Sequence, residues 1–102
     1  MIENFVMPKV SVRLSGRLTF VSSLNNNEIQ VELSDGSTLK NLIEKTADII
    51  GGNFKDELTR SNGEIKTYPM VGINGRLERK PYGWVQLQDG DQIVLFLPVG
   101  GG

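Results

Sequence analysis

Two segments in the first third of the chain alternate apolar and polar residues with a period of two. They cover residues 9–14 and 28–33, with an aliphatic side chain at every second position. This alternation is typical of a half-buried β-strand. Gly16 is expected to end the first strand, and the asparagines at 25–27 signal a turn before the second. The pattern predicts a β-hairpin in which residues 17–27 form an elaborated tip, either by extending a strand or by folding back as a loop.

Residues 39–50 show a different period, with apolar side chains three or four positions apart. Such spacing is typical of an amphipathic helix. Ser37 or Thr38 can cap its start by accepting hydrogen bonds from amides of the first turn, and Gly51-Gly52 can cap its end. A glycine pair that follows a helix is poorly placed to be a phosphate loop. The apolar positions of this predicted helix are Leu39, Leu42, Ile43, Ala47 and Ile50.

Three more strand-like segments occur in the second half of the chain. The first covers residues 68–73 and ends at Asn74-Gly75, a pair that favours a tight hairpin loop. Residues 76–78 can return from that loop as a short edge strand. The last segment covers residues 93–97 and follows a turn at Asp89-Gly90.

Smaller features lie between these segments. Residues 54–58 are expected to form a short helical turn, and Trp84 is expected to pack against the core. Arg76, Arg79 and Lys80 form a small basic cluster, which we interpret as an ordinary solvated face rather than a binding patch.

The order of the predicted elements indicates the fold class. Two strands, a helix, a strand, a short edge element and a last strand suggest an α+β domain with the helix across one face of a mixed sheet. The last strand is apolar on both of its faces, which favours a central position. This is the pattern of the β-grasp fold, with one domain over residues 1–97 and a flexible tail over residues 98–102.

Composition removes several classes of chemistry. The chain has 102 residues, a net charge of −1, no cysteine and no histidine. A thiol nucleophile, a disulfide framework and a histidine-based triad are therefore excluded, and a metal site would need carboxylates alone. The balanced charge differs from the clustered positive charge of a nucleic-acid-binding surface. Residues 1–8 do not resemble a signal peptide, and no apolar run has the length of a membrane helix. The simplest expectation is a cytoplasmic protein that binds neither nucleic acid nor membrane.

The end of the sequence is the candidate site. After the apolar run come Pro98, Val99 and then Gly100, Gly101 and Gly102. Glycine lacks a Cβ, so a partner can approach the backbone closely and the carboxyl carbon of Gly102 is unhindered. Residues 97–102 can extend about 20 Å, enough to thread a narrow channel in another protein.

Residues just before the glycines are candidates for docking a partner. Phe96 and Leu97, with Pro98 and Val99, would form an apolar docking surface beside the tail. The alternative for Phe96 is a place in the core.

Three sequence segments together resemble a known family. They are residues 71–76 (Val-Gly-Ile-Asn-Gly-Arg), residues 87–93 (Leu-Gln-Asp-Gly-Asp-Gln-Ile) and residues 98–102 (Pro-Val-Gly-Gly-Gly). A strand ending in Asn-Gly, an L-x-D-G-D turn and a terminal Gly-Gly are similar to the ubiquitin-like sulfur carriers, the ThiS/MoaD superfamily. The resemblance is closest to the small subunit of molybdopterin synthase. It covers residues from about 10 to 102.

This resemblance implies a non-catalytic carrier whose partners do the chemistry. A ubiquitin-activating-type enzyme would use ATP to adenylate Gly102, with Gly101 and Gly100 giving access. A sulfur donor, such as a cysteine desulfurase system, would then replace AMP and leave a terminal thiocarboxylate. The large subunit of molybdopterin synthase would accept the tail, and the sulfur would build the dithiolene of the molybdenum or tungsten cofactor. No cofactor would be bound by this chain itself.

Other functions remain open at this point. The same tail could deliver sulfur for thiamine synthesis or for transfer-RNA thiolation. It could instead form an isopeptide bond to a lysine, as a ubiquitin-like modifier does. A plain β-grasp interaction module without tail chemistry is the remaining alternative.

Overall fold

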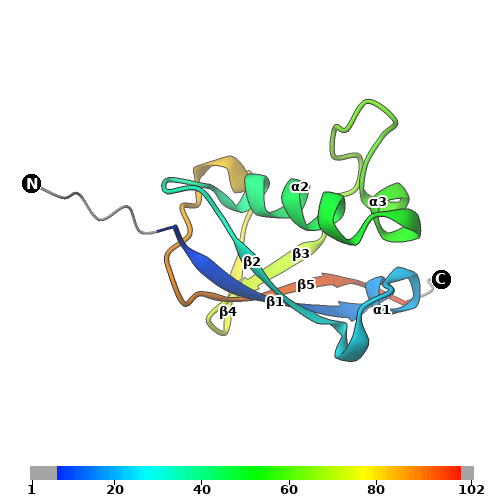
Figure 1. Cartoon of the computed structure of the whole chain (residues 1–102), viewed down its shortest axis with the longest axis horizontal. Coiled ribbons are helices and arrows are strands. Elements are labelled where there is room, and N and C mark those ends of the chain that lie inside the picture. Colours follow the sequence, from blue (N-terminus) through cyan, green and yellow to red (C-terminus); the bar gives the residue numbers. More distant parts are fainter. Residues whose placement is uncertain (1–6, 100–102) are drawn as a thin grey trace, which may run out of the picture.

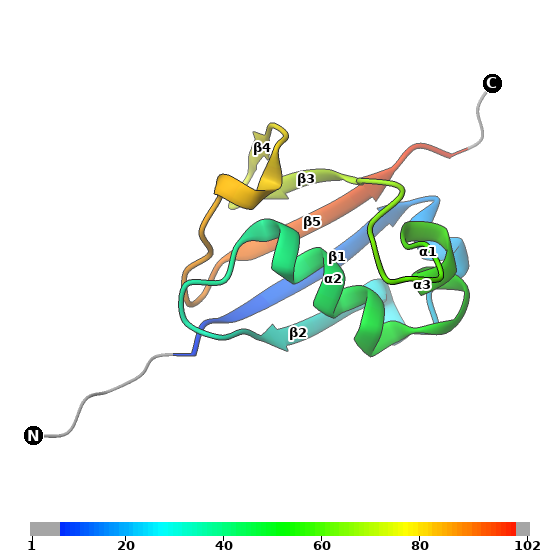
Figure 2. The same cartoon turned by 90° about the horizontal axis from the view of Figure 1, so that it is seen from above.

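The computed structural model of the chain describes residues 7–99, and over that range the fold is built on one mixed sheet. The strands lie in the order β2-β1-β5-β3-β4 (Figure 2). Their bounds are β1 (Lys9–Gly16), β2 (Glu28–Glu32), β3 (Met70–Ile73), β4 (Arg76–Glu78) and β5 (Gln92–Leu97). The α+β class with a β-grasp arrangement, predicted from the order of the elements, is confirmed.

The last strand, β5, lies in the centre of the sheet, as its two-sided apolar sequence predicted. It runs parallel to β1, with Ser11 opposite Gln92 and Gly16 opposite Leu97. On its other side it is antiparallel to β3. The remaining pairs, β1–β2 and β3–β4, are antiparallel hairpins, so both predicted hairpins are confirmed.

The main helix, α2 (Leu39–Ile50), crosses one face of the sheet (Figure 1). Its first residue follows Thr38, whose side chain accepts a hydrogen bond from the Asn41 amide, while the Asn41 side chain accepts one from the Thr38 amide. This reciprocal arrangement satisfies two free donors at the start of the helix. Gly51 caps the other end with φ +65°, a conformation that costs glycine little. None of the described helices is long and apolar enough to cross a membrane.

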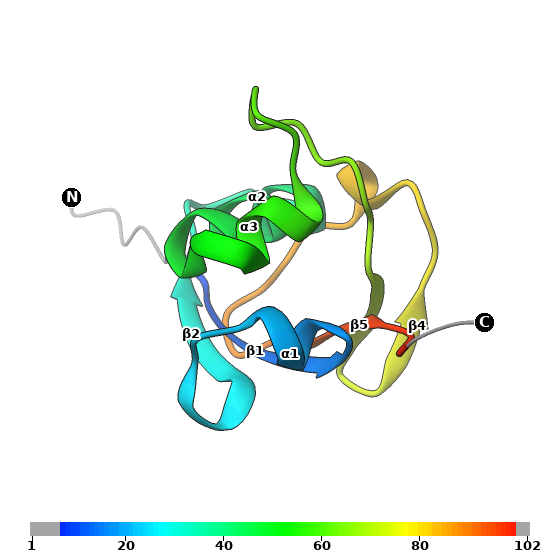
Figure 3. The same ribbon diagram turned by 90° about the vertical axis from the view of Figure 1, so that its right-hand side faces the viewer.

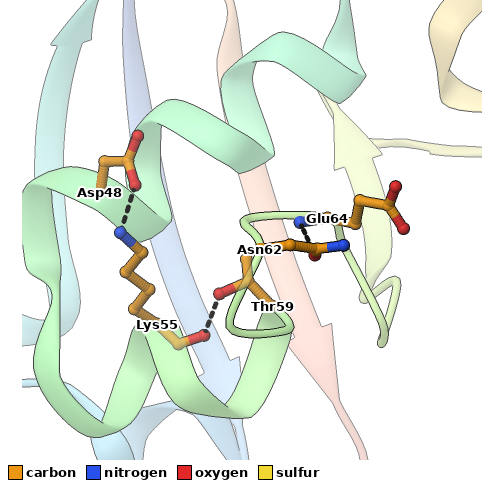
Figure 4. Close-up of polar contacts among 5 residues, drawn as sticks. All are labelled: Asp48, Lys55, Thr59, Asn62 and Glu64. Carbon is orange, nitrogen blue, oxygen red and sulfur yellow. Dashed lines mark hydrogen bonds and ion pairs between the residues drawn. The ribbon is translucent and has the colours of Figure 1, made fainter.

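A second helix, α3 (Gly52–Leu58), follows at once and lies on the same side of the sheet as α2 (Figure 3). Polar contacts of Lys55 stabilise this helix (Figure 4). Lys55 forms an ion pair with Asp48 of α2 at 2.8 Å, and the Thr59 hydroxyl donates to the Lys55 carbonyl, also at 2.8 Å. The expected helical turn at residues 54–58 is therefore part of a slightly longer helix.

The hairpin tip, for which the sequence left two alternatives, folds back and contains helical turns. Helix α1 (Leu18–Val21) and the 3-10 turn η1 (Asn25–Asn27) occupy it. Leu18 is fully buried, so the tip is packed against the domain rather than extended as strand.

The core lies between the sheet and the helices. It takes alternate residues from β1, β2, β3 and β5 and the apolar stripe of α2, together with Phe54 and Leu58 of α3. All but one of the apolar positions predicted for α2 are fully buried, and Ile50 is half-buried at its end. Burial of a Leu or Ile side chain is worth about 1.5–3 kcal/mol, so this stripe is a large share of the stability of the domain.

One core prediction is wrong. Trp84, expected to pack against the core, is 85% exposed, and Tyr82 is buried in its place. Both residues belong to the 3-10 turn η2 (Tyr82–Trp84). Tyr82 can be buried because its hydroxyl donates a hydrogen bond to the Pro69 carbonyl at 3.0 Å. A short loop offered no periodicity from which to choose between the two aromatic residues.

The register of α2 can be tested with one substitution at two positions. Ile43 is fully buried and Ile49, on the same helix, is 48% exposed. Ile43→Asp places an unpaired carboxylate in the core, at a cost of about 4 kcal/mol or more, and should leave the domain largely unfolded at 37 °C. Ile49→Asp should lower the free energy of unfolding by about 1 kcal/mol or less. Chemical denaturation measures both, and equal losses would show that the register of α2 is wrong.

Candidate functional site

The end of β5 is fixed in place by the residues that follow β1. The amide of Arg17 donates to the carbonyl of Leu97 at 2.7 Å, just beyond the last pair of the ladder. Gly16 has φ +65°, and a Cβ at this position would lie 1.9 Å from the Leu97 carbonyl oxygen. No other residue can be accommodated there without moving backbone. The point where the chain leaves the sheet toward its C-terminal residues is therefore set by close backbone contact.

Residues of helix α1 stabilise this backbone contact. Leu18 is buried in the core, and the Thr19 hydroxyl donates to the Gly16 carbonyl at 2.8 Å. Arg17 also forms an ion pair with Glu57 of α3. The elaborated hairpin tip thus connects the end of the central strand to the helical layer.

The four predicted docking residues fall on different sides of the molecule. Leu97 is 7% exposed and belongs to the core, so the expectation that it shares the exposed side of the strand is corrected. The reason is the parity of β5: Leu97 has the same orientation as Leu95 and Ile93, which face the helices. Pro98 and Val99 are exposed, Val99 by 60%. The predicted reactive residue Gly102, with Gly100 and Gly101, lies outside the described residues.

Phe96 is half-buried and is not part of the core, although the sequence left that alternative open. It lies on the face of the sheet opposite α2, paired with Met70 of β3. A Cβ on Gly16 would lie 2.9 Å from its ring, so the ring covers the glycine at the end of β1. Phe96 is thus held by its neighbours while one part of it stays accessible.

Around Phe96 the uncovered side of the sheet is apolar and hollowed. We call it the outer sheet face and define it by Met70, Gly72, Leu77, Val94 and Phe96. These residues line a depression of about 320 Å³, and Met70 and Leu77 are 44% and 67% exposed. Sequence reasoning found only Phe96 of this set. The signal for the others was present, because the positions between the buried residues of β3 and β5 are apolar as well.

Gly72 keeps the depression open. Its φ is not positive, and a Cβ there would meet only ordinary contacts, 3.8 Å from the Arg76 carbonyl and 4.0 Å from the Val94 side chain. The backbone therefore does not require glycine. Glycine inside a strand often marks a place where another molecule approaches closely.

The motif residues that carry the family resemblance form a structural network. Asn74 donates from its side-chain amide to Asp91 at 3.0 Å and accepts from the Gln92 amide at 2.9 Å. Asp91 in turn accepts from the Gln88 amide at 2.8 Å. The Asn-Gly and L-x-D-G-D segments thus join two turns at one end of the sheet, which agrees with the interpretation of Gly75 and its neighbours as turn residues.

The described residues offer little acid–base chemistry of their own. In the range 7–99 no three acidic side chains are grouped so that they could hold a metal ion. Burial, reinforced by the nearby charge of Glu78, raises the pKa of Tyr82, which keeps its hydroxyl protonated as a donor. What this part of the chain presents is an apolar surface and a fixed origin for the C-terminal residues.

Comparison with solved structures shows that the chain shares its fold with ubiquitin-like proteins. SAMP1, the small archaeal modifier protein 1 of Haloferax volcanii, matches with a TM-score of 0.73 at 20% identity, covering 92% of this chain and 99% of that one. A putative molybdopterin converting factor subunit 1 from Pyrococcus furiosus matches at 0.65 and 25%, covering 90% and 99%. Subunit 1 in a complex of subunits 1 and 2 of the molybdopterin-converting factor from Helicobacter pylori matches at 0.54 and 21%, covering 92% and 99%. No protein-family model and no curated protein sequence matches the chain.

These structures are of the kind that the sequence motifs resemble, so the resemblance is confirmed at the level of the fold. This chain has the β-grasp fold of the ubiquitin-like sulfur carriers and modifiers.

The network at Asn74 predicts a graded loss of stability. Asn74 has φ +50°, which glycine adopts freely and alanine does not. Asn74→Gly removes the side-chain hydrogen bonds and should lower the free energy of unfolding by about 1–2 kcal/mol. Asn74→Ala adds backbone strain and should lower it by about 1 kcal/mol more. Urea denaturation of the two variants separates these effects, and equal losses would mean that the backbone conformation of Asn74 contributes nothing.

Proposed function

We propose that this chain is a carrier protein whose C-terminal glycine, Gly102, is activated by a partner enzyme and then transfers a group. The observation that carries the proposal is the fixed end of the central strand. Gly16 and Arg17 hold Leu97, and the exposed Pro98 and Val99 lead away from it. A reacting group on a short segment with a fixed origin can be presented to a partner with little loss of conformational entropy.

The chemistry required of Gly102 is activation of a carboxylate. Its negative charge repels nucleophiles, so one oxygen must first become part of a leaving group. In the proposed reaction a ubiquitin-activating-type enzyme joins the carboxylate to the α-phosphate of ATP and releases pyrophosphate. A persulfide of the donor system then attacks the carbonyl carbon and displaces AMP, which gives an acyl disulfide. A thiol of the partner breaks the S–S bond, so that this chain keeps a terminal thiocarboxylate and the partner sulfurs form a disulfide. This chain supplies the carbonyl carbon, and the partners supply the catalytic groups.

The outer sheet face is the proposed docking surface for these partners. Its apolar depression lies on the side of the sheet opposite α2 and α3 (Figure 1), and Phe96 connects it to the residues that lead into the tail. A partner bound there would receive the tail in one orientation, because Gly16 and Arg17 hold the end of β5 in place. The Helicobacter pylori structure, in which subunit 1 is in complex with subunit 2, supports a large-subunit partner for a protein of this fold.

The pathway that we favour is molybdopterin synthesis. The two molybdopterin-converting-factor subunits among the similar structures support it, as does the resemblance in the sequence motifs. In that pathway the large subunit accepts the tail and the thiocarboxylate sulfur is transferred to the pterin precursor. Sulfur delivery for thiamine or for transfer RNA would use the same activated tail.

A second candidate function is protein modification. The similarity to SAMP1, whose name describes a modifier, favours it. In that case a lysine amine of a target protein would attack the activated carbonyl and form an isopeptide bond. Both functions share adenylation of Gly102 and differ only in the nucleophile that follows.

The carboxylate reaction should depend strictly on the position of Gly102. One added residue moves the reactive carbon by about 3.5 Å, and a displacement of about 1 Å can cost a hundredfold when geometry controls the rate. Deleting Gly102, or adding one alanine after it, should abolish adenylation or the following transfer, while the melting temperature stays unchanged. Pyrophosphate exchange with the activating enzyme and intact-mass analysis measure both steps.

The product separates the two candidates. Wild type recovered with one oxygen replaced by sulfur at Gly102 supports the carrier, whereas conjugates to lysines alone support the modifier. Activation of the alanine-extended protein as fast as wild type would contradict both.

The docking surface predicts a loss of partner binding without a loss of fold. Gly72→Leu fills the depression, and Phe96→Ser removes its aromatic wall, so each should weaken binding of the activating enzyme by about tenfold or more. Trp84→Ser is the matched control, because it also replaces a surface aromatic side chain with serine. Trp84 is 85% exposed and lies on η2, away from the outer sheet face. Calorimetric titration measures binding, and thermal melting verifies the fold. Wild-type affinity in both variants would exclude the outer sheet face as the docking surface.

A further inference from the structure

A second hollow lies on the helical side of the sheet, next to the edge formed by β3 and β4. It has a volume of about 380 Å³ and lies between the first turn of α2, the segment before β3 and the turn η2. Figure 2 shows η2 beside the start of α2, on the side of the sheet that carries β3 and β4. Its lining residues are Lys40, Tyr68, Lys80, Pro81, Tyr82 and Gly83. Neither the fixed end of β5 nor the outer sheet face contributes to it.

Two tyrosines form the apolar wall of this hollow. The rings of Tyr68 and Tyr82 are 5.8 Å apart and tilted by 58° to each other, a favourable aromatic geometry. The Tyr82 hydroxyl donates to the Pro69 carbonyl, and Tyr82 is only 3% exposed, so its buried ring supports the half-buried ring of Tyr68 from the core side. The wall is therefore held in place before any ligand arrives.

Two lysines provide the charge at this hollow. Lys80 has its Nζ 5.6 Å from the centre of the Tyr68 ring, a cation–π distance, and Lys40 reaches the hollow from α2. Among the described residues the ion pairs involve other side chains, so neither lysine is neutralised by a carboxylate. Arg79 is exposed next to Lys80, and Glu78 is the acidic residue close to Tyr82. The balance at the hollow is positive.

Gly83 leaves the hollow open although the fold does not demand glycine there. Its φ is not positive, and a Cβ would meet no atom within 4 Å. A larger side chain could be introduced at this position without a backbone clash. The opening is therefore a property that one substitution can remove.

We propose that this hollow binds an acidic peptide segment of a partner protein, with an apolar side chain against the half-buried ring of Tyr68 and flanking carboxylates on Lys40 and Lys80. Charge complementarity argues for a carboxylate-bearing ligand, and the concave aromatic wall argues for an aliphatic side chain between the carboxylates. A nucleic acid is a poorer fit, because its backbone requires a more extended basic surface and the chain has a net charge of −1. The site is independent of chemistry at Gly102.

The test uses the full-length protein and a defined probe. The probe is an N-acetylated, C-amidated pentapeptide with a central leucine and two acidic residues on either side; the control peptide carries glutamines in place of the acids. Backbone-amide NMR of the labelled protein locates binding. Fluorescence of Trp84, the one tryptophan of the chain and the neighbour of Gly83, gives the affinity. We expect shifts at Lys40, Tyr68, Lys80, Tyr82 and Gly83 with the acidic peptide and not with the glutamine peptide.

Three variants make the test specific. Lys80→Glu should weaken binding by about tenfold, the loss expected for one charge-assisted contact. Arg60→Glu makes the same change in net charge at an exposed position in the loop after α3, and should leave affinity within about twofold of wild type. Gly83→Leu should block binding while the melting temperature stays unchanged.

Each outcome decides for or against the site. Shifts confined to the outer sheet face, equal losses in Lys80→Glu and Arg60→Glu, or equal binding of the glutamine peptide would overturn the proposal. Binding of a single-stranded RNA oligonucleotide, but not of the peptide, at the same residues would replace it with nucleic-acid recognition. The variant without Gly102 should bind the acidic peptide as wild type does, so a failure of the carrier function does not affect this result.

Discussion

The strand β5 is hydrogen-bonded on both sides, parallel to β1 and antiparallel to β3, and the other features of the domain follow from that position. Parallel pairing with β1 places the ends of these two strands together, so that Gly16 and Arg17 meet Leu97. Because a shift of one residue would move every side chain of β5 to the opposite face, burial of its core side fixes the register. The segment that carries the proposed chemistry therefore begins at one of the best-determined points of the fold.

The two faces of β5 have different roles: one belongs to the core, and the other belongs to the proposed docking surface. Ile93, Leu95 and Leu97 face the helices and are buried, whereas Val94 and Phe96 face the uncovered side. Substitutions on the first set act on folding, and those on the second set act on the proposed docking surface. This separation lets a small domain present apolar side chains to partners while its core stays closed to water.

The motifs that identify the fold are not the groups that would react. Asn74 and Asp91 join two turns through their side chains, and Gly75 and Gly90 provide the positive φ values that those turns require. Their contribution is to the architecture that holds β5. The resemblance in these motifs consequently predicted the fold well, whereas the pathway depends on the partners that meet Gly102.

Local periodicity was enough to predict the bounds of α2, the hairpins and the central place of β5, because the spacing of apolar residues and the capping by Thr38 act over a few neighbouring positions. It could not decide which way Phe96 and Leu97 point, since a strand that is apolar on both faces gives no parity signal. It also misplaced Trp84, in a loop without a period. The outer sheet face and the second hollow, which is lined in part by Lys40 and Lys80, are each formed by residues that are distant in sequence. Only the tertiary structure decided these features, because strand pairing and helix packing determine which distant side chains share a surface.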